Sequence, residues 1–161
     1  MAEAIDFKQI GTRPVRPDGV EKVTGRALFG ADLILPNMVH GKVLRSPHAH
    51  AKINSVDVSG ALAIEGVFSA ISGADLPPVE PGSPLADTAK NTMARDKVVY
   101  HGQAVAAVSA ATPDLAERAL AAIKVDYEAL PPVLDVVAAM SEDSVLVDEE
   151  NYTNLPEKPE K

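Results

Sequence analysis

The stretch TPDLAERALAAIKVDYEALPP, residues 112–132, constrains the fold more than any other part of the chain. Thr112 is a typical N-cap, and Pro113 suits the first helical position because its missing N–H would have no partner there. Apolar residues then recur at the spacing of one helix face, at Ala116, Ala119, Leu120 and Ile123. The pattern next changes to period two, with Val125 and Tyr127 on the inner face of a strand. A capped helix joined directly to an alternating strand predicts an α+β domain.

Two further extended stretches lie on either side of a predicted corner. In NMVHGKVLRS, residues 37–46, Val39, Gly41 and Val43 alternate with the residues between them, which is typical of a half-buried strand that ends at Ser46-Pro47. The chain becomes extended again in AHAKINSVDV, residues 49–58. The intervening SPHA is therefore predicted to be the corner between two strands.

Three more stretches predict strands. EKVTGRALFGADL, residues 21–33, is interpreted as a strand with a turn on each side, and VFSAIS, residues 67–72, as a short apolar strand. KVVYHGQAVAAVSA, residues 97–110, contains two apolar runs around a turn at Gly102. No internal repeat is predicted.

A second, shorter helix is predicted in SGALAIEG, residues 59–66. Ser59 is its expected N-cap, Leu62 is expected on its inner face, and Gly66 follows its last turn. The expected fold is thus a mixed or antiparallel sheet with about two packed helices.

The predicted domain limits follow from composition. Residues 1–18 are rich in proline and glycine without periodicity and are expected to form an extended arm. Residues 19–140 are the folded domain, and residues 141–161 an acidic tail or linker. Residues 73–96 contain four prolines and no apolar periodicity, and loops of that length tend to be functional or mobile.

Composition excludes several classes of function. A net charge of −8 and only 4% aromatic residues argue against nucleic-acid binding, which needs a basic surface and aromatic platforms. The absence of cysteine excludes disulfides, thiolate zinc sites and iron–sulfur ligation by this chain. There is no apolar run of 18 residues and no leader-like N-terminus, so no membrane association is expected and the predicted location is the cytoplasm.

The segment RSPHAHA, residues 45–51, is the most suggestive site candidate. His48 and His50 share a face of an extended chain and would need a third ligand, such as Asp57 or His101, to hold a metal. Side chains that hydrogen-bond the nearby backbone at a corner are the favoured alternative. The Arg45 guanidinium is suited to clamp a carboxylate or a neighbouring chain, with a surface ion pair as the default.

Other motifs carry less information. Neither a G-x-G-x-x-G loop, a G-K-[ST] loop nor a G-x-S-x-G elbow is present. Lys97 invites comparison with the modified lysine of lipoyl or biotin carriers, but it opens a strand rather than sitting in a tight Met-Lys turn. Local patterns alone therefore indicate an α+β domain without a self-contained active site.

Several segments, in order, resemble one family. They are GTRPVRPDGVEKVTGRALFGADL, NMVHGKVLRSPHAHAKINSVDVSGAL, GVFSAISGADLP, DKVVYHGQAVAAVSAATPDLAERAL and IKVDYEALPPVLDVVAAM. They are similar to the α/β-hammerhead domain of the molybdopterin-binding subunit of the xanthine dehydrogenase/aldehyde oxidase family, the molybdenum hydroxylases. The resemblance spans about Ile10 to Met140, and RSPHAHAKI together with VDYEALPPV is its most specific part.

The resemblance implies a part of an oxidoreductase that hydroxylates an aldehyde or an N-heterocycle. Electrons would leave a molybdopterin centre through [2Fe–2S] clusters to FAD or another acceptor. The family's glutamate base and pterin-binding residues lie in later domains, so no catalytic, cofactor or metal residue is expected in this chain. Gly102-Gln103 is not the family's cofactor-contacting glutamine. The implied partners are the molybdopterin-binding domain or subunit and iron–sulfur and FAD subunits.

The resemblance also assigns roles to individual residues. Arg45, His48, His50 and Gly102 are expected to be a strand-corner signature that packs against the cofactor domains or a partner subunit without binding metal. Residues 82–93, with Leu85 and Met93 as apolar contacts, are the expected substrate-channel element.

Three functional hypotheses remain open from the sequence. The first is the hammerhead portion of a molybdenum hydroxylase, inactive as an isolated chain, as a split subunit or a truncated product. The second is a stand-alone binding or scaffold module without catalytic activity. The third and weakest is a lipoyl-like carrier modified at Lys97.

Overall fold

The computed structural model describes residue 8 and residues 10–78, 83, 88, 91–141 and 143–149. The chain divides into two units, Met1–Met38 and Val39–Lys161. The division falls at residue 38, whereas the limits expected from composition were at residues 18 and 140; those domain limits remain a prediction. No helix in the described ranges is both long and apolar enough to cross a membrane.

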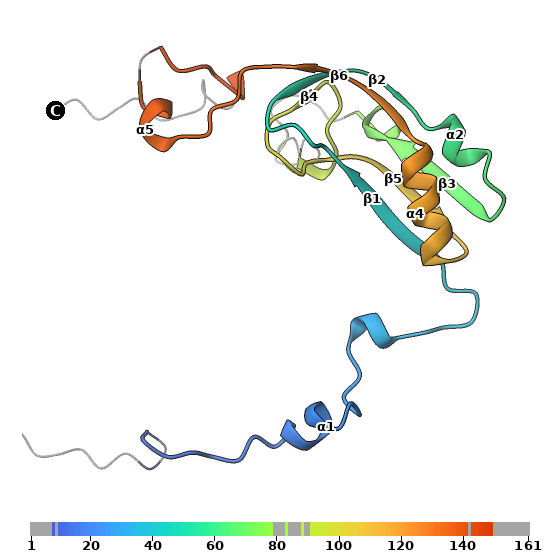
Figure 1. Ribbon diagram of the computed structural model, residues 1–161, viewed down its shortest axis with the longest axis vertical. Coiled ribbons are helices and arrows are strands. Elements are labelled where there is room, and N and C mark those ends of the chain that lie inside the picture. Colours follow the sequence, from blue (N-terminus) through green and yellow to red (C-terminus); the bar gives the residue numbers. More distant parts are fainter. Residues whose placement is uncertain are drawn as a thin grey trace, which may run out of the picture. The chain divides into compact units, whose positions relative to one another are not determined.

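The second unit contains two antiparallel sheets of three strands each (Figure 1). The first sheet, sheet A, has β1 (His40–Arg45) and β3 (Val67–Ser72) on either side of β5 (Ala104–Ala110). The second, sheet B, has β4 (Lys97–Val98) and β6 (Lys124–Ala129) on either side of β2 (Ala51–Asp57). The predicted α+β class is confirmed, and the strands expected within residues 37–46, 49–58 and 67–72 and around Val125 and Tyr127 are β1, β2, β3 and β6.

The main core lies between sheet A and helix α4 (Pro113–Ala122). As predicted, Thr112 caps this helix, its Oγ1 accepting from the Leu115 N–H at 3.2 Å, and Pro113 is the first helical residue. The buried face of the helix is made of small side chains, which let it approach the sheet closely. The buried residues of this core are Ala61, Ala70, Ala106, Val108, Ala110, Ala116, Ala119 and Ile123, of which Ala116 and Ala119 belong to α4.

Helix α2 (Ser59–Leu62) is shorter than the predicted helix at residues 59–66, and a different side chain faces the core. Its N-cap is Val58, and its inward side chain is Ala61, while Leu62 is 51% exposed. The cause is a close contact with the end of α4: a Cβ on Gly60 would lie 2.7 Å from the Ala122 carbonyl oxygen. The expectation that Leu62 faces the core is therefore wrong, because packing against α4 fixes the orientation of so short a helix.

The strand order alternates between the sheets. Along the chain, β1, β3 and β5 enter sheet A, and β2, β4 and β6 enter sheet B. The two apolar runs around Gly102 are strands, as predicted, but β4 and β5 pair with different neighbours and not with each other. Every connection between successive strands therefore crosses from one sheet to the other.

The first unit is built from two short helices. Helix α1 spans Gly19–Val23, and a 3₁₀ turn, η1, spans Gly30–Asp32. Helix α1 ends in a Schellman arrangement, in which the Arg26 N–H donates to the Glu21 carbonyl at 2.8 Å and Gly25 has φ of +71°. The strand predicted for residues 21–33 is wrong, because Gly25 supplies a helix C′ residue and no described strand pairs with this stretch.

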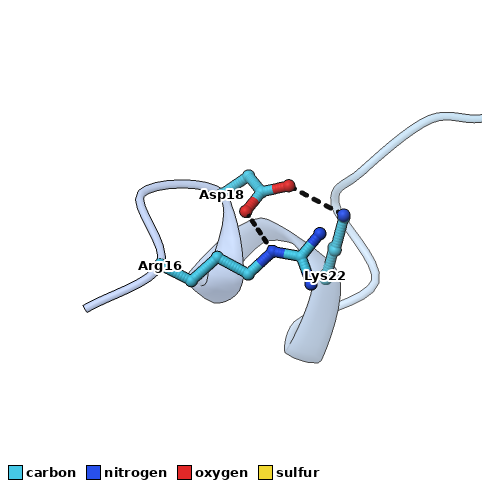
Figure 2. Close-up of polar contacts among 3 residues, drawn as sticks. All are labelled: Arg16, Asp18 and Lys22. Carbon is cyan, nitrogen blue, oxygen red and sulfur yellow. Dashed lines mark hydrogen bonds and ion pairs between the residues drawn. The ribbon is translucent and has the colours of Figure 1, made fainter. Parts of the chain in front are cut away.

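A charge cluster holds the first turn of α1 (Figure 2). Asp18 lies between two basic side chains, with its Oδ1 2.6 Å from Arg16 Nε and its Oδ2 2.7 Å from Lys22 Nζ. The Lys22 ammonium, followed by the Arg16 guanidinium, lowers the pKa of Asp18 below its ordinary value. This cluster is exposed, so it positions the start of the helix rather than contributing much to overall stability.

The Asp18 cluster predicts a pH dependence for α1. A lowered folded-state pKa means that the stabilisation is present above the unfolded value of about 3.9 and is lost as pH falls through the folded-state pKa. We expect the Asp18 carboxyl to titrate below that value by NMR, and the amide shifts of residues 19–23 to follow it. In the Asp18→Asn variant those amide shifts should no longer show the transition that follows the Asp18 carboxyl. An Asp18 midpoint at or above the ordinary value would contradict the assignment.

Candidate functional site

The candidate site is the place where two short connections between the sheets meet. One connection, residues 46–50, joins β1 to β2, and the other, residues 99–103, joins β4 to β5. Backbone polar groups that are buried where the two connections meet need partners within the chain. The predicted corner at SPHA is the first of these two connections.

Three hydrogen bonds join the two connections. The Ser46 N–H donates to the Gln103 carbonyl at 2.9 Å, and the Gly102 N–H donates to the Ser46 carbonyl at 3.0 Å. Arg45 Nη1 donates to the Gly102 carbonyl at 2.9 Å. Gly102 has φ of +84°, a conformation that favours glycine and allows the turn to close by a Gln103 N–H to Tyr100 carbonyl bond of 3.2 Å. The structure thus brings Arg45 and Gly102 together, and Arg45 binds a backbone carbonyl where an ion pair was the default expectation.

A hydrogen bond between Ser46 and His48 lies within the first connection. Ser46 is buried, and its Oγ accepts from the His48 N–H at 3.0 Å. The His48 ring meets Tyr127 of β6 edge to face, with ring centroids 5.0 Å apart. Burial raises the pKa of Tyr127, and a hydrogen bond with the Ser46 side chain offsets part of that rise. His48 is therefore a packing residue that connects the corner to sheet B.

His50 fastens the end of β6 to the corner. Its Nδ1–H donates to the Pro131 carbonyl at 2.8 Å, and its own carbonyl accepts from the Leu130 N–H at 3.0 Å. Because a carbonyl can only accept, the proton of a neutral His50 ring lies on Nδ1. Nε2 is buried without a partner, so both nitrogens of this ring are withdrawn from solvent.

Gln103 is the polar residue of the site that the sequence reasoning missed. It is 1% exposed, and its Oε1 accepts from the Val99 N–H at 2.8 Å. The available signal was its position: an amide directly after a glycine turn, at the start of an apolar strand. Such an amide is suited to satisfy the backbone of the turn it leaves.

The described residues contain no group of three or more His, Cys, Asp or Glu side chains placed to hold a metal ion. His48 and His50 point to different partners, an aromatic ring and a backbone carbonyl. Ser46 and Gln103 of the corner bind the backbone of the connections, and His48 and His50 contact Tyr127 and Pro131. The geometry of these contacts suits a rigid corner better than a reaction centre.

The comparison with known proteins decides the family. Residues 24–131 match the family described as "Aldehyde oxidase and xanthine dehydrogenase, a/b hammerhead domain". The chain belongs to this hammerhead family. The match includes both connections of the corner, so the resemblance based on RSPHAHAKI and VDYEALPPV is confirmed.

The relatives of this hammerhead domain are large subunits. The chain is 39% identical over 140 residues to "Nicotinate dehydrogenase large molybdopterin subunit" of Eubacterium barkeri, covering 86% of this chain and 32% of the relative. It is 36% identical over 143 residues to "Carbon monoxide dehydrogenase large chain" of Afipia carboxidovorans, covering 88% and 18% respectively. Among solved structures, quinoline 2-oxidoreductase from Pseudomonas putida 86 superposes with a TM-score of 0.72 at 34% identity, over 91% of this chain and 20% of the other.

The hammerhead chain thus spans a third or less of the length of these relatives. It is a domain of the molybdenum hydroxylase large subunits, and the rest of those subunits lies outside it. The Eubacterium barkeri relative is a little over half as long as the Afipia one, because a similar stretch makes up 32% of the first and 18% of the second. Members of this family therefore differ in how much polypeptide accompanies the hammerhead.

The remaining predicted residues of the hammerhead domain can be placed only in part. Met93 is buried at 5% exposure, and Leu85 lies outside the described residues. Their role as channel contacts stays a prediction. Lys97 pairs with Glu149, which holds the segment after β6 near β4.

Transition metals provide a test of the corner. We expect zinc or nickel added to the purified chain to leave its melting temperature unchanged, because His50 Nδ1 is occupied by Pro131 and Nε2 is enclosed. Thermal unfolding with and without metal measures this, with a His48→Ala, His50→Ala double variant as the control. Metal-dependent stabilisation that disappears in the double variant would show a histidine metal site.

Proposed function

We propose that this polypeptide is the hammerhead portion of a molybdenum hydroxylase and works with polypeptide that carries the molybdopterin centre. Its role is to form a rigid support and part of the substrate channel for hydroxylation of an aldehyde or an N-heterocycle. Iron–sulfur and FAD subunits complete the proposed complex. The cytoplasmic location predicted from the sequence is part of this proposal.

The family match over a chain that spans only 15% to 32% of its curated relatives is the observation behind the proposal. The matched domain is one part of those relatives, so the proposed role is that of one part of such an enzyme. The corner agrees with such a role, because it joins the two sheets through internal hydrogen bonds.

The described residues do not fit a molybdopterin or iron–sulfur site. The only buried side-chain nitrogen or oxygen without a partner among them is His50 Nε2, inside the corner, and one such atom does not make a converging set of donors. The sequence has no cysteine to ligate an iron–sulfur cluster. Each of these cofactors is therefore assigned to other polypeptide.

Apolar side chains on the outside of both units also support the proposal. Among the described residues of the first unit, nine large apolar residues are more than half exposed: Ile10, Val15, Val20, Val23, Leu28, Phe29, Leu33, Ile34 and Leu35. In sheet A, Val43 pairs with Ala107, which pairs with Ile71, so the three form one row across the face opposite the α4 core. Val43 is 42% exposed. Apolar groups gathered in this way typically mark surfaces that another polypeptide covers.

Affinity purification of the tagged chain from its native cell tests the proposal. We expect a co-eluting polypeptide with the remaining molybdopterin-binding domains, identified by peptide sequencing, and molybdenum and iron in the same fraction. A lone monomer without either metal would instead favour a stand-alone binding module. An added cofactor mass on Lys97 would favour a carrier.

A further inference from the structure

The connection between β3 and β4 divides the second unit into two halves. The first half, residues 39–78, contains β1, β2, α2 and β3, and the second half, residues 91–140, contains β4, β5, α4 and β6. Every described strand pairing joins one half to the other, because β1 and β3 pair with β5, and β4 and β6 pair with β2. Among the described strands, neither half contains a pair of its own.

This arrangement is unusual for antiparallel sheets. Strands that follow one another in a chain are neighbours roughly two-thirds of the time, commonly as hairpins that form locally. Here none of the described pairings joins successive strands, so neither half holds a hairpin. Each sheet takes its central strand from one half and both outer strands from the other, with β5 central in sheet A and β2 central in sheet B. Each half thus completes a sheet of the other.

The buried residues of the cores are divided in the same way. In the main core, Ala61 and Ala70 belong to the first half, and the buried residues of β5, α4 and the C-cap of α4 belong to the second. In a second, smaller core, Ile53 of the first half packs with Val98 and Val105 of the second. Chains of about 40 residues or fewer usually need disulfides, metals or a partner subunit to fold, and this chain has no cysteine. A separated half would therefore lack a sufficient core.

Hydrogen bonds outside the sheets also cross between the halves. The Ala111 N–H donates to the Gly66 carbonyl at 2.9 Å, and the bonds that join the two connections of the corner belong to the same set. Arg95 Nη2 donates to the Pro77 carbonyl at 2.7 Å. This last bond brings together the points at which the first half ends and the second begins. The halves are thus held by contacts that do not depend on the covalent connection.

We infer that each half is the binding partner of the other, and that the domain also assembles from two polypeptides divided within residues 79–90. The interaction surface of the second half consists of both edges of β5 and the buried face of α4. The partner that fits it is a polypeptide with the sequence of residues 39–78. Folding of each half is coupled to this binding. The inference concerns how the domain is assembled, and it does not depend on the proposed function.

Cleavage of the full chain between the halves tests the inference. A protease recognition sequence inserted between residues 85 and 86 only lengthens the connection, so the uncut chain should melt within about 3 °C of wild type. After cleavage, pieces 1–85 and 86–161 should elute together from a sizing column at the volume of the uncut chain. Because unfolding now releases two pieces, tenfold dilution should lower the melting temperature of the cut chain by roughly 5–10 °C, and that of the uncut chain should not change.

Reassembly of the separated pieces tests the identity of the partner. The pieces of the cut chain are separated in urea, and each is returned to buffer alone or with the other. Alone, neither should show a cooperative melting transition, and the mixture should recover the transition of the cut chain. A peptide of residues 39–78 should also restore a cooperative transition to piece 86–161. A peptide of the same composition in scrambled order is the matched control and should restore none.

Each outcome decides for or against the inference. Co-elution, melting that depends on dilution, and recovery only in the mixture support it. Pieces that part on the sizing column after cleavage overturn it, and a cooperative transition in either piece alone does so too, because that half would then fold without a partner. An uncut insertion chain that does not melt cooperatively counts against it, since the connection would then be needed for folding. Equal recovery with the scrambled peptide overturns the assignment of residues 39–78 as the partner.

Discussion

Replacing Gly73 with alanine is expected to destabilise the hammerhead domain more than any other single methyl group discussed for this chain. The added Cβ would lie 2.2 Å from the Ala94 carbonyl oxygen and 2.9 Å from its carbon, and because these nearest atoms are backbone, no flexible side chain can move aside. Overpacking of this kind typically costs about 1–3 kcal/mol and sometimes more. We expect about 3 kcal/mol, which in a domain of this size lowers the melting temperature by about 6–12 °C.

Thermal and urea unfolding measure the effect of Gly73→Ala, and Gly30→Ala is its control. The control makes the same substitution in the other GAD turn, η1, where no described atom of the first unit lies within 4 Å, so its change should be below about 0.5 kcal/mol. A Gly73→Ala chain as stable as wild type would mean that the 3₁₀ turn η2 (Gly73–Asp75) does not rest on the Ala94–Arg95 peptide.

Substitution of Gln103 is expected to have the second largest effect, because this side chain satisfies the turn that joins the sheets. Gln103→Ala removes the acceptor of the Val99 N–H and leaves a cavity at a position that is 1% exposed. An unsatisfied buried donor costs about 1–3 kcal/mol, and the cavity adds to it. We expect a loss of about 2–4 kcal/mol in the free energy of unfolding.

Two further variants separate the causes at Gln103. Gln103→Met keeps most of the volume and removes the acceptor, so it should lose about 1–3 kcal/mol and speed hydrogen exchange at the Val99 amide. His101→Ala alters an exposed neighbour in the same turn and should change stability little. If Gln103→Met were as stable as wild type, the Val99 hydrogen bond would contribute nothing and the side chain would only fill space.

Local signals sufficed for some elements. The α4 helix follows from Thr112 and Pro113, and the inner face of β6 follows from alternation at Val125 and Tyr127. In both, the cap or the period is encoded within a few adjacent residues. The position of the RSPHAHA corner was also predicted, because Ser-Pro interrupts two extended stretches.

Other features depend on contacts that the local sequence does not contain. The division of β4 and β5 between two sheets depends on long-range pairing, with β4 bound to β2 and β5 bound to β1 and β3. The partner of His50, Pro131, is 81 residues away in the chain. The stretch 21–33 resembles a strand between two turns, but no strand pairs with it in the described residues, and Gly25 ends a short helix there.

The hydrogen bonds of the corner fit the proposed supporting role of this domain. Arg45 donates to the Gly102 carbonyl, and His50 donates to the Pro131 carbonyl beyond β6. Ser46 Oγ accepts from the His48 N–H within its own connection. A corner built in this way stays rigid when a large neighbour packs against it. Rigidity is the property that a channel wall needs, since a small displacement at a bound substrate is costly in rate.

Molybdenum analysis of the chain purified alone, with an aldehyde-oxidation assay on the same sample, tests the central claim most directly. We predict no stoichiometric molybdenum and no turnover by the chain alone, and both in the complex captured from the native cell. Stoichiometric molybdenum on the isolated chain, or aldehyde oxidation without a partner, would contradict the account.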